Sequence, residues 1–113
     1  MKIKTINKKE LKKKLDNKDK FKLVNTLGTW QFMAKRIPGS INLDSLEKAE
    51  KLLKKDDEII VYCSHKLCSA SQMAYHTLAA KGYKNVRRYA GGIDEWERAG
   101  YPLEGEMVDK NEK

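Results

Sequence analysis

The feature that most constrains the fold is an unbroken apolar run, Ile-Ile-Val-Tyr, at residues 59–62. Three of its four residues are β-branched, and such side chains favour an extended backbone. Because no polar residue alternates with them, both faces of this strand must be buried, as in a parallel sheet covered by helices on both sides. The run therefore predicts a buried parallel strand, and Cys63 stands at its carboxyl end, where ligands bind in such sheets.

Helical and extended segments alternate along the rest of the chain, which is typical of a parallel α/β sheet. We expect an α/β fold with a small parallel β-sheet flanked by helices on both faces. No repeat or change of composition marks a second domain, so residues 1–104 are predicted to form a single domain and residues 105–113 a polar C-terminal tail. The predicted helices are residues 5–15, 46–53, 70–81 and 93–99, and the other extended segments are residues 21–25, 41–43 and 86–89.

Single residues indicate where two of these helices begin and which side of a third is buried. Thr5 is a candidate capping residue for the N-terminal helix, and Asp44 or Ser45 for the second helix. On the helix that begins near residue 70, apolar side chains recur at helical spacing, which predicts that this side faces the core. The predicted apolar face consists of Ala70, Met73, Ala74, Thr77 and Leu78.

The charge is positive and unevenly distributed. Lys and Arg number 24 against 16 Asp and Glu, a net charge of +8, and ten of the lysines lie in the first 22 residues. Such a segment can attract nucleic acid or anionic lipid. However, no aromatic residues are interleaved with the lysines, as a single-strand binding surface requires. We interpret the lysines as a solvated helix face, and nucleic-acid and membrane partners are disfavoured.

No apolar run approaches the roughly 20 residues of a membrane-spanning helix, and the N-terminus lacks the apolar stretch of a signal peptide. A cytoplasmic location is therefore expected. A chain of 113 residues, 40% of them hydrophobic, can form a core without a disulfide, so Cys63 and Cys68 are interpreted as reactive or buried thiols. Neither His65 nor His76 completes a zinc spacing with them, and no metal site is expected.

The position of Cys63 makes it a candidate nucleophile. It follows the buried strand and precedes a helix by a few residues, where backbone N–H groups and the helix dipole favour an anion. A thiol held there ionises more readily than a free cysteine, and the thiolate is the reactive form. The alternative is that Cys63 is a small buried residue that ends the strand. Spacing alone does not decide between these two interpretations.

Several short motifs follow one another along the chain. They are Leu-Val-Asn at residues 23–25, Ile-Pro-Gly-Ser-Ile-Asn at 37–42, Val-Tyr-Cys at 61–63 with Ser-Ala at 69–70, Tyr-Ala-Gly-Gly-Ile-Asp-Glu-Trp at 89–96, and Gly-Tyr-Pro at 100–102. In order and spacing they resemble the motifs of the rhodanese-like sulfurtransferase domains, over nearly the whole chain. Each motif is weak by itself, whereas all of them in register identify the family.

The resemblance implies that Cys63 takes a sulfane sulfur from a small anionic donor such as thiosulfate or polysulfide, or from a protein persulfide. Cys63 then carries it as a persulfide and passes it to a thiol, to cyanide or to a protein acceptor, without a cofactor or metal. Arg36, before the Ile-Pro-Gly turn, is a candidate anion guide. The loop lacks the arginine with which related phosphatases and arsenate reductases clamp an oxyanion. The residues expected to form the substrate-binding loop are Ser64, His65, Lys66, Leu67, Cys68 and Ser69.

Some positions depart from the family pattern. Asn25 stands where an acidic residue is common, Leu27 where an arginine is, and Arg36 where a histidine is frequent. The loop ends in Cys68, as in a subset of single-domain members with cysteines at both ends. An alternative therefore stays open: a rhodanese-fold binding or redox-sensing module of low activity that uses a Cys63–Cys68 thiol/disulfide pair. A disulfide requires Cα atoms within about 7 Å, a distance that the sequence does not supply.

Overall fold

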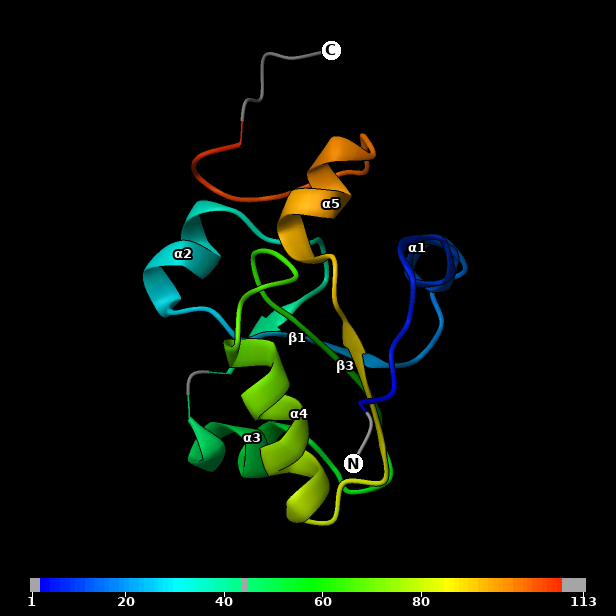
Figure 1. Cartoon of the computed structure of the whole chain (residues 1–113), viewed down its shortest axis with the longest axis vertical. Helices are drawn as coiled ribbons and strands as arrows, with labels where there is room; N and C mark the ends of the chain where they lie inside the picture. Colours follow the sequence, from blue (N-terminus) through cyan, green and yellow to red (C-terminus); the bar gives the residue numbers. More distant parts are fainter. Residues whose placement is uncertain (1–2, 44, 109–113) are drawn as a thin grey trace.

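The computed structural model describes residues 3–43 and 45–108. Within these residues a parallel sheet of four strands has the order β2-β1-β3-β4 (Figure 1). The predicted apolar run forms β3, an inner strand, and every residue from Ile59 to Tyr62 is completely buried. The expectation of a small parallel α/β sheet is confirmed. The strands are β1 (Lys22–Asn25), β2 (Ile41–Asn42), β3 (Glu58–Tyr62) and β4 (Asn85–Tyr89).

Helices cover both faces of the sheet, as the fold class requires. Figure 1 shows α3 and α4 next to each other on one side of the sheet and α1 on the other. Alternate residues of β3 point into two separate cores, because successive side chains of a strand face opposite ways. Ile60 and Tyr62 pack with α1 and α5, whereas Ile59 and Val61 pack with α3 and α4. The helices are α1 (Lys8–Asp16), α2 (Thr29–Ala34), α3 (Leu46–Leu52), α4 (Ala70–Ala80) and α5 (Gly92–Arg98).

The N-terminal helix begins later than predicted. Thr5 does not cap it but forms an isolated parallel bridge with Arg88 of β4. The backbone here is extended, since the Ile6 N–H donates to the Arg88 carbonyl at 3.1 Å. Asn7 is the cap instead: its side chain accepts from the Glu10 N–H at 2.8 Å, and Glu10 accepts in return from the Asn7 N–H. Pairing with a distant strand thus overrides the local capping preference of Thr5.

The buried side of α4 follows the prediction only in part, since Leu78 of the predicted face is buried in the core. Its buried residues are Ser71, Tyr75 and Leu78, whereas Met73 is 66% exposed. Two of these buried residues are polar and have distant partners: the Tyr75 hydroxyl accepts from the Lys4 N–H at 3.1 Å, and Ser71 accepts from Arg88. Long-range hydrogen bonds therefore turn the helix away from its most apolar face.

The start of α3 follows one of the two predicted caps. The Ser45 hydroxyl accepts a hydrogen bond from the Lys48 N–H at 3.3 Å. The other candidate, Asp44, lies outside the described residues.

A segment near the end of the chain packs on α2. Arg36 and Glu104 form an antiparallel backbone bridge, and the Glu106 and Met107 N–H groups donate to the carbonyls of Met33 and Ala34, both at 2.9 Å. Residues 105–108 of the predicted tail are thus attached to the domain. Residues 109–113 lie outside the described residues, and the division at residue 104 otherwise stays a prediction.

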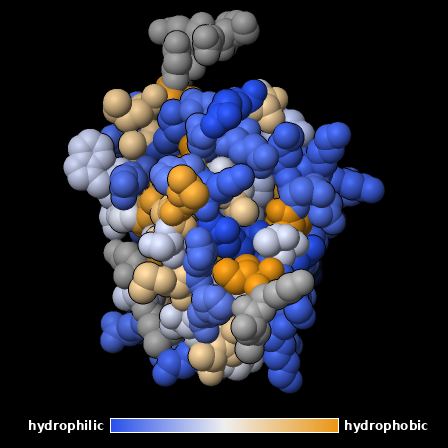
Figure 2. Space-filling model, viewed as in Figure 1, coloured by the Kyte–Doolittle hydropathy of each residue, from blue (hydrophilic) through white to orange (hydrophobic). Residues whose placement is uncertain are grey.

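Several lysines of α1 lie in ion pairs. Lys12 pairs with Asp16 at 2.7 Å, and Lys14 with Glu58 of β3 at 2.8 Å. The face drawn in Figure 2 is mainly hydrophilic, and its apolar side chains form small separate patches. Across residues 3–43 and 45–108, no helix is long and apolar enough to cross a bilayer.

Candidate active site

The loop between β3 and α4 lies at the carboxyl end of the inner strand β3. Cys63 follows β3 directly and is 1% exposed, whereas Cys68, just before α4, is partly exposed. The tip of the loop is open to solvent, and Leu67 is 83% exposed. His65 and Lys66 are exposed beside it. The structure thus places one predicted cysteine in the interior and the other at the surface.

A disulfide joins Cys63 and Cys68, whose Cα atoms are 6.3 Å apart. This separation is ordinary for a disulfide. The two sulfurs therefore meet, which the sequence left open. In this state neither cysteine is a nucleophile, and reduction of the bond provides two thiols within one loop.

The first half of the loop is held by the start of α5. The Ile93 N–H donates to the Cys63 carbonyl at 3.1 Å, and the Asp94 N–H donates to the Ser64 carbonyl at 2.8 Å. Gly92, with a φ of +66°, makes this approach possible, since a Cβ atom on it would lie 2.6 Å from the Cys63 carbonyl oxygen. The second glycine of the Gly-Gly motif is therefore needed for contact with the loop.

The second half of the loop is held by Arg88 of β4, which is 7% exposed. Its Nη2 donates to the Lys66 carbonyl at 2.9 Å and to the Cys68 carbonyl at 3.4 Å, and its Nε donates to the Ser71 hydroxyl at 2.8 Å. Burial lowers the pKa of the Arg88 guanidinium, which nevertheless stays charged at neutral pH. A positive charge thus lies against a loop that contains no arginine of its own.

Sequence reasoning missed Arg88, although a signal was present. Val86 belongs to the core on the α4 side of the sheet. Because strand side chains alternate, Arg88 must face the same side, toward the helix that follows the loop. A charged residue at a position expected to be buried requires polar partners, and the loop carbonyls are those partners.

Tyr62, one residue before Cys63, joins the site to the neighbouring turn. Its hydroxyl accepts from the Asn25 amide at 3.0 Å and from the Ile37 N–H at 3.1 Å, and it donates to the Ser40 hydroxyl at 2.9 Å. Burial raises the pKa of the Tyr62 phenol, which keeps the donated proton in place. The Asn25 side chain also accepts from the Leu27 N–H at 2.8 Å. At position 25, where the family often has an acid, a neutral amide thus satisfies the local hydrogen bonds.

Arg36, the candidate anion guide, already has partners. Its Nε lies 3.4 Å from a Glu104 carboxylate oxygen, and its guanidinium stacks over the Phe32 ring at 4.9 Å. The next residue, Ile37, contacts Tyr62, so this turn lies beside the carboxyl end of β3. A role of Arg36 in guiding anions stays a prediction.

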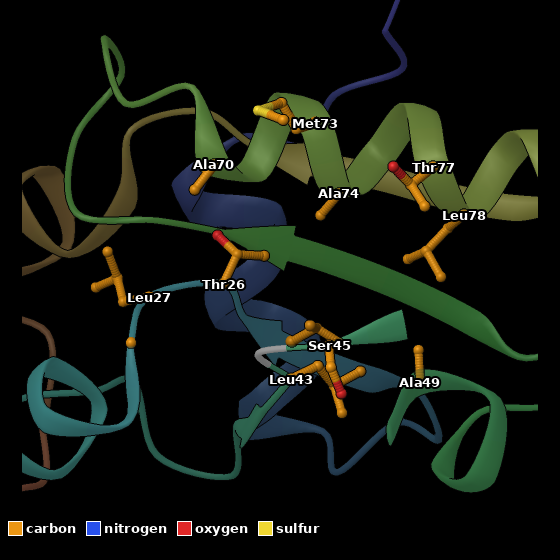
Figure 3. Close-up of a pocket in the computed structure, with 12 residues that line it drawn as sticks. Thr26, Leu27, Leu43, Ser45, Ala49, Ala70, Met73, Ala74, Thr77 and Leu78 are labelled. Atoms are coloured by element: carbon orange, nitrogen blue, oxygen red, sulfur yellow. The ribbon is translucent and has the colours of Figure 1, made fainter. Parts of the chain in front are cut away.

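A surface groove with a volume of about 380 Å³ lies between α3 and α4 (Figure 3). Its walls include the α4 face that was predicted to be buried, and of this face Met73 borders solvent whereas Leu78 is buried. No residue of the Cys63–Ser69 loop lines it. The lining residues are Val24, Thr26, Leu27, Gly28, Leu43, Ser45, Ala49, Ala70, Met73, Ala74, Thr77 and Leu78.

The described part of the chain has no cluster of potential metal ligands. Among residues 3–43 and 45–108, no three His, Cys, Asp or Glu residues form a group that could hold a metal ion.

The sequence matches the family model for the Rhodanese-like domain over residues 7–99. It is 34% identical over 84 residues to the thiosulfate sulfurtransferase GlpE of Pseudomonas savastanoi pv. phaseolicola, a match that covers 73% of this chain and 76% of that protein. It is also 34% identical over 92 residues to the adenylyltransferase and sulfurtransferase UBA4 of Candida albicans, a match that covers 73% of this chain. The chain spans only 20% of the length of UBA4.

Solved structures show the same architecture. The solution structure of the rhodanese-like domain of an Anabaena protein matches 98% of this chain and 85% of that chain, with a TM-score of 0.84 and 23% identity. The crystal structure of a rhodanese-related protein from Thermoplasma volcanium matches 91% of this chain and 99% of that chain, with a TM-score of 0.75 and 26% identity. The site described above therefore stands in a fold with several solved representatives.

Proposed function

Because this chain belongs to the rhodanese-like domain family, we propose that it is a sulfurtransferase and that Cys63 is its sulfur-carrying nucleophile. The observation that carries the proposal is the position of Cys63. It lies at the carboxyl end of an inner parallel strand, in a loop whose carbonyls are held by α5 and Arg88. Relatives named thiosulfate sulfurtransferase support the same class of reaction.

In the proposed reaction the Cys63 thiolate attacks the outer sulfur of a donor such as thiosulfate, and sulfite leaves. Cys63 is then a persulfide, whose outer sulfur is negatively charged. Within the described residues, the N–H groups of His65 and Lys66 have no hydrogen-bond acceptor and can donate to this anion. Lys66 and His65 also stand at the exposed tip, where they can attract an anionic donor. A thiol, cyanide or a protein acceptor then removes the sulfur.

The reaction must begin from the reduced protein, because the disulfide occupies both cysteines. A cytoplasmic location, where thiols are kept reduced, fits this requirement. The physiological donor and acceptor are further proposals: small anionic sulfur compounds or protein persulfides as donors, and thiols as acceptors.

Sulfur uptake by the reduced protein tests the proposal. Mixed with thiosulfate, the wild type and Cys68→Ser should both release sulfite. Cys68→Ser should also gain the mass of one sulfur atom, located on Cys63 by peptide mapping. Cys63→Ser is the matched control and should do neither. The assignment would be overturned if the reduced wild type released no sulfite from thiosulfate and Cys68→Ser gained no sulfur on Cys63 from polysulfide.

The disulfide favours a second candidate function, a redox-sensing module of low activity. Such a module would form the Cys63–Cys68 bond reversibly under mild oxidant while turning over donors slowly or not at all. Rapid donor turnover in Cys68→Ser would count against it, since that variant retains no intramolecular pair.

A further inference from the structure

We infer that Cys68 resolves the persulfide carried by Cys63: it displaces the outer sulfur as hydrosulfide and leaves the Cys63–Cys68 disulfide for a dithiol to reduce. The inference rests on the proposed function, since it requires a loaded Cys63. It adds to that function a specific product, sulfide, and a specific class of co-substrate, a dithiol.

The first support is the distance between the two cysteines and the way in which it is maintained. Their Cα atoms are 6.3 Å apart. The loop that sets this distance is held by contacts other than the disulfide: α5 holds the carbonyls of Cys63 and Ser64, and Arg88 holds the carbonyl of Cys68. The reduced loop therefore retains Cys68 beside Cys63. An internal thiol held at bonding distance has a large kinetic advantage over a thiol in solution.

The second support is the difference in exposure. In the disulfide form Cys63 is 1% exposed, and its sulfur is in contact with that of Cys68. Cys68 is partly exposed, so it is the more accessible of the two disulfide cysteines to a reductant. Attack there expels Cys63 as a thiolate, the form needed for the next donor.

The electrons balance without an external oxidant. The Cys68 thiolate attacks Sγ of Cys63, the bond from this Sγ to the outer sulfur breaks, and the outer sulfur leaves with the electron pair. The proton given up by the Cys68 thiol appears on the product as hydrosulfide. Two thiols have become a disulfide, and the sulfane sulfur has been reduced to sulfide. A dithiol then reduces the disulfide by two exchange steps and is itself oxidised.

A single-turnover experiment tests this sequence of steps. The wild type is reduced, freed of reductant under anaerobic conditions and mixed with thiosulfate without any external thiol. We expect one equivalent each of sulfite and sulfide per chain, and a protein that has lost the mass of two hydrogens through a Cys63–Cys68 bond. Cys68→Ser and Cys68→Ala should release sulfite alone and retain one sulfur.

A cyanide chase provides an independent measurement on the same samples. Excess thiosulfate is removed and cyanide is then added, which converts any persulfide into thiocyanate. The two Cys68 variants should yield about one equivalent, whereas the wild type should yield almost none because its sulfur has already left. After cyanide is removed, fresh thiosulfate alone should release a second equivalent of sulfite from the Cys68 variants, whose Cys63 is again a free thiol. The wild type should do so only after treatment with dithiothreitol, because its Cys63 is held in the disulfide.

The outcomes separate this inference from the proposed function. A wild type that releases sulfite, keeps its sulfur and yields thiocyanate would overturn the resolving role of Cys68 and leave the sulfurtransferase assignment intact. A disulfide formed between two chains would also overturn it. If neither the wild type nor the Cys68 variants release sulfite, the proposed function fails first. The wild-type sulfide measurement needs no variant to fold.

Discussion

The two halves of the Cys63–Ser69 loop are held by different kinds of contact. The first half rests on main-chain hydrogen bonds from Ile93 and Asp94 to the carbonyls of Cys63 and Ser64. The second half rests on one side chain, that of Arg88, which donates to the carbonyls of Lys66 and Cys68. Main-chain contacts form with almost any side chain, provided that there is room for the approach. A side-chain anchor disappears with one substitution.

The two halves of the loop should therefore be sensitive to different kinds of substitution. The half that contains Cys63 should be sensitive to added volume, because Gly92 packs against it. The half that contains Cys68 should be sensitive to lost hydrogen bonds, because Arg88 supplies them. If Cys63 receives the sulfur and Cys68 releases it, these two sensitivities should affect different steps of the reaction.

Gly92→Ala should have the largest effect. A side chain in this left-handed conformation costs about 1–3 kcal/mol, and its Cβ would also displace the Cys63 carbonyl, 2.6 Å away. We expect a lower melting temperature and sulfite release from thiosulfate slowed by about tenfold to a hundredfold, since small misplacements of reacting groups have effects of this size. Stopped-flow measurement of sulfite checks the rate.

Gly100→Ala is the matched control for the previous variant. Gly100 has a φ of +79°, but no heavy atom lies within 4 Å of an added Cβ. Gly100→Ala therefore has the same backbone strain as Gly92→Ala but no steric clash with another residue. Its rate of sulfite release should equal that of the wild type. Equal rates in the Gly92 and Gly100 variants would show that the first half of the loop does not depend on this close approach.

Arg88→Met should have the next largest effect. It removes hydrogen bonds to two loop carbonyls and to Ser71, which should lower the free energy of unfolding by about 1–3 kcal/mol. It also removes a positive charge beside the thiols, so their pKa values should rise. The pH midpoint of alkylation of the reduced protein should move upward, and urea unfolding gives the stability.

Arg87→Met is the control for Arg88. Arg87 is the preceding residue of β4, but its guanidinium pairs with Glu58 at 2.8 Å and remains partly exposed. Its loss should cost at most about 1 kcal/mol and leave the alkylation midpoint unchanged. A shift of equal size in both variants would mean that the net charge of the protein, rather than contact with the loop, controls the thiols.

Ser71→Ala should have a smaller effect. It removes the acceptor of a single hydrogen bond from the Arg88 Nε and leaves the two carbonyl contacts in place. We expect a loss of about 1 kcal/mol in urea unfolding and a small change in the rate of disulfide formation. Ser69→Ala, at an exposed position before α4, is the comparison and should be neutral. If Ser71→Ala loses as much stability as Arg88→Met, the main role of Arg88 is its hydrogen bond to Ser71 of α4 and not its contacts with the loop carbonyls.

Leu67→Ser should have the smallest effect. Leu67 is 83% exposed at the loop tip, and neither anchor involves its side chain. Stability should change by less than about 0.5 kcal/mol, and single-turnover sulfide release should be unchanged. Leu78→Ala, in the buried face of α4, should cost about 2–5 kcal/mol in the same unfolding assay. A strong kinetic defect in Leu67→Ser would mean that the tip positions the cysteines.

Features that depend on local residue type could be predicted from the sequence. The run at residues 59–62 indicates a buried parallel strand because β-branched residues without polar alternation have few other stable environments. Trp96, the last residue of the motif at 89–96, is fully buried and donates to the Pro102 carbonyl at 2.8 Å. Cys63 could be placed at the carboxyl end of β3 by counting from the run.

Features that depend on distant partners could not be predicted. Helix α2 has Gly28 as its cap, with no side-chain hydrogen bond, and carbonyls near its end are satisfied by Glu106 and Met107 from far along the chain. The start of α1 is set by pairing of residues 4–6 with Arg88. The contact between the two cysteines likewise depends on how the loop is anchored, which the spacing of five residues does not reveal.

The hydroxyl of Tyr62 links the neighbouring turn to the strand that precedes Cys63. That single oxygen joins Asn25, Ile37 and Ser40 to the strand whose next residue is Cys63. The Pro38–Gly39 turn is thus linked to β3 by hydrogen bonds with the residues on either side of it, at 3.1 Å and 2.9 Å. A molecule that docks on this turn would therefore contact a segment that is hydrogen-bonded directly to the strand preceding Cys63.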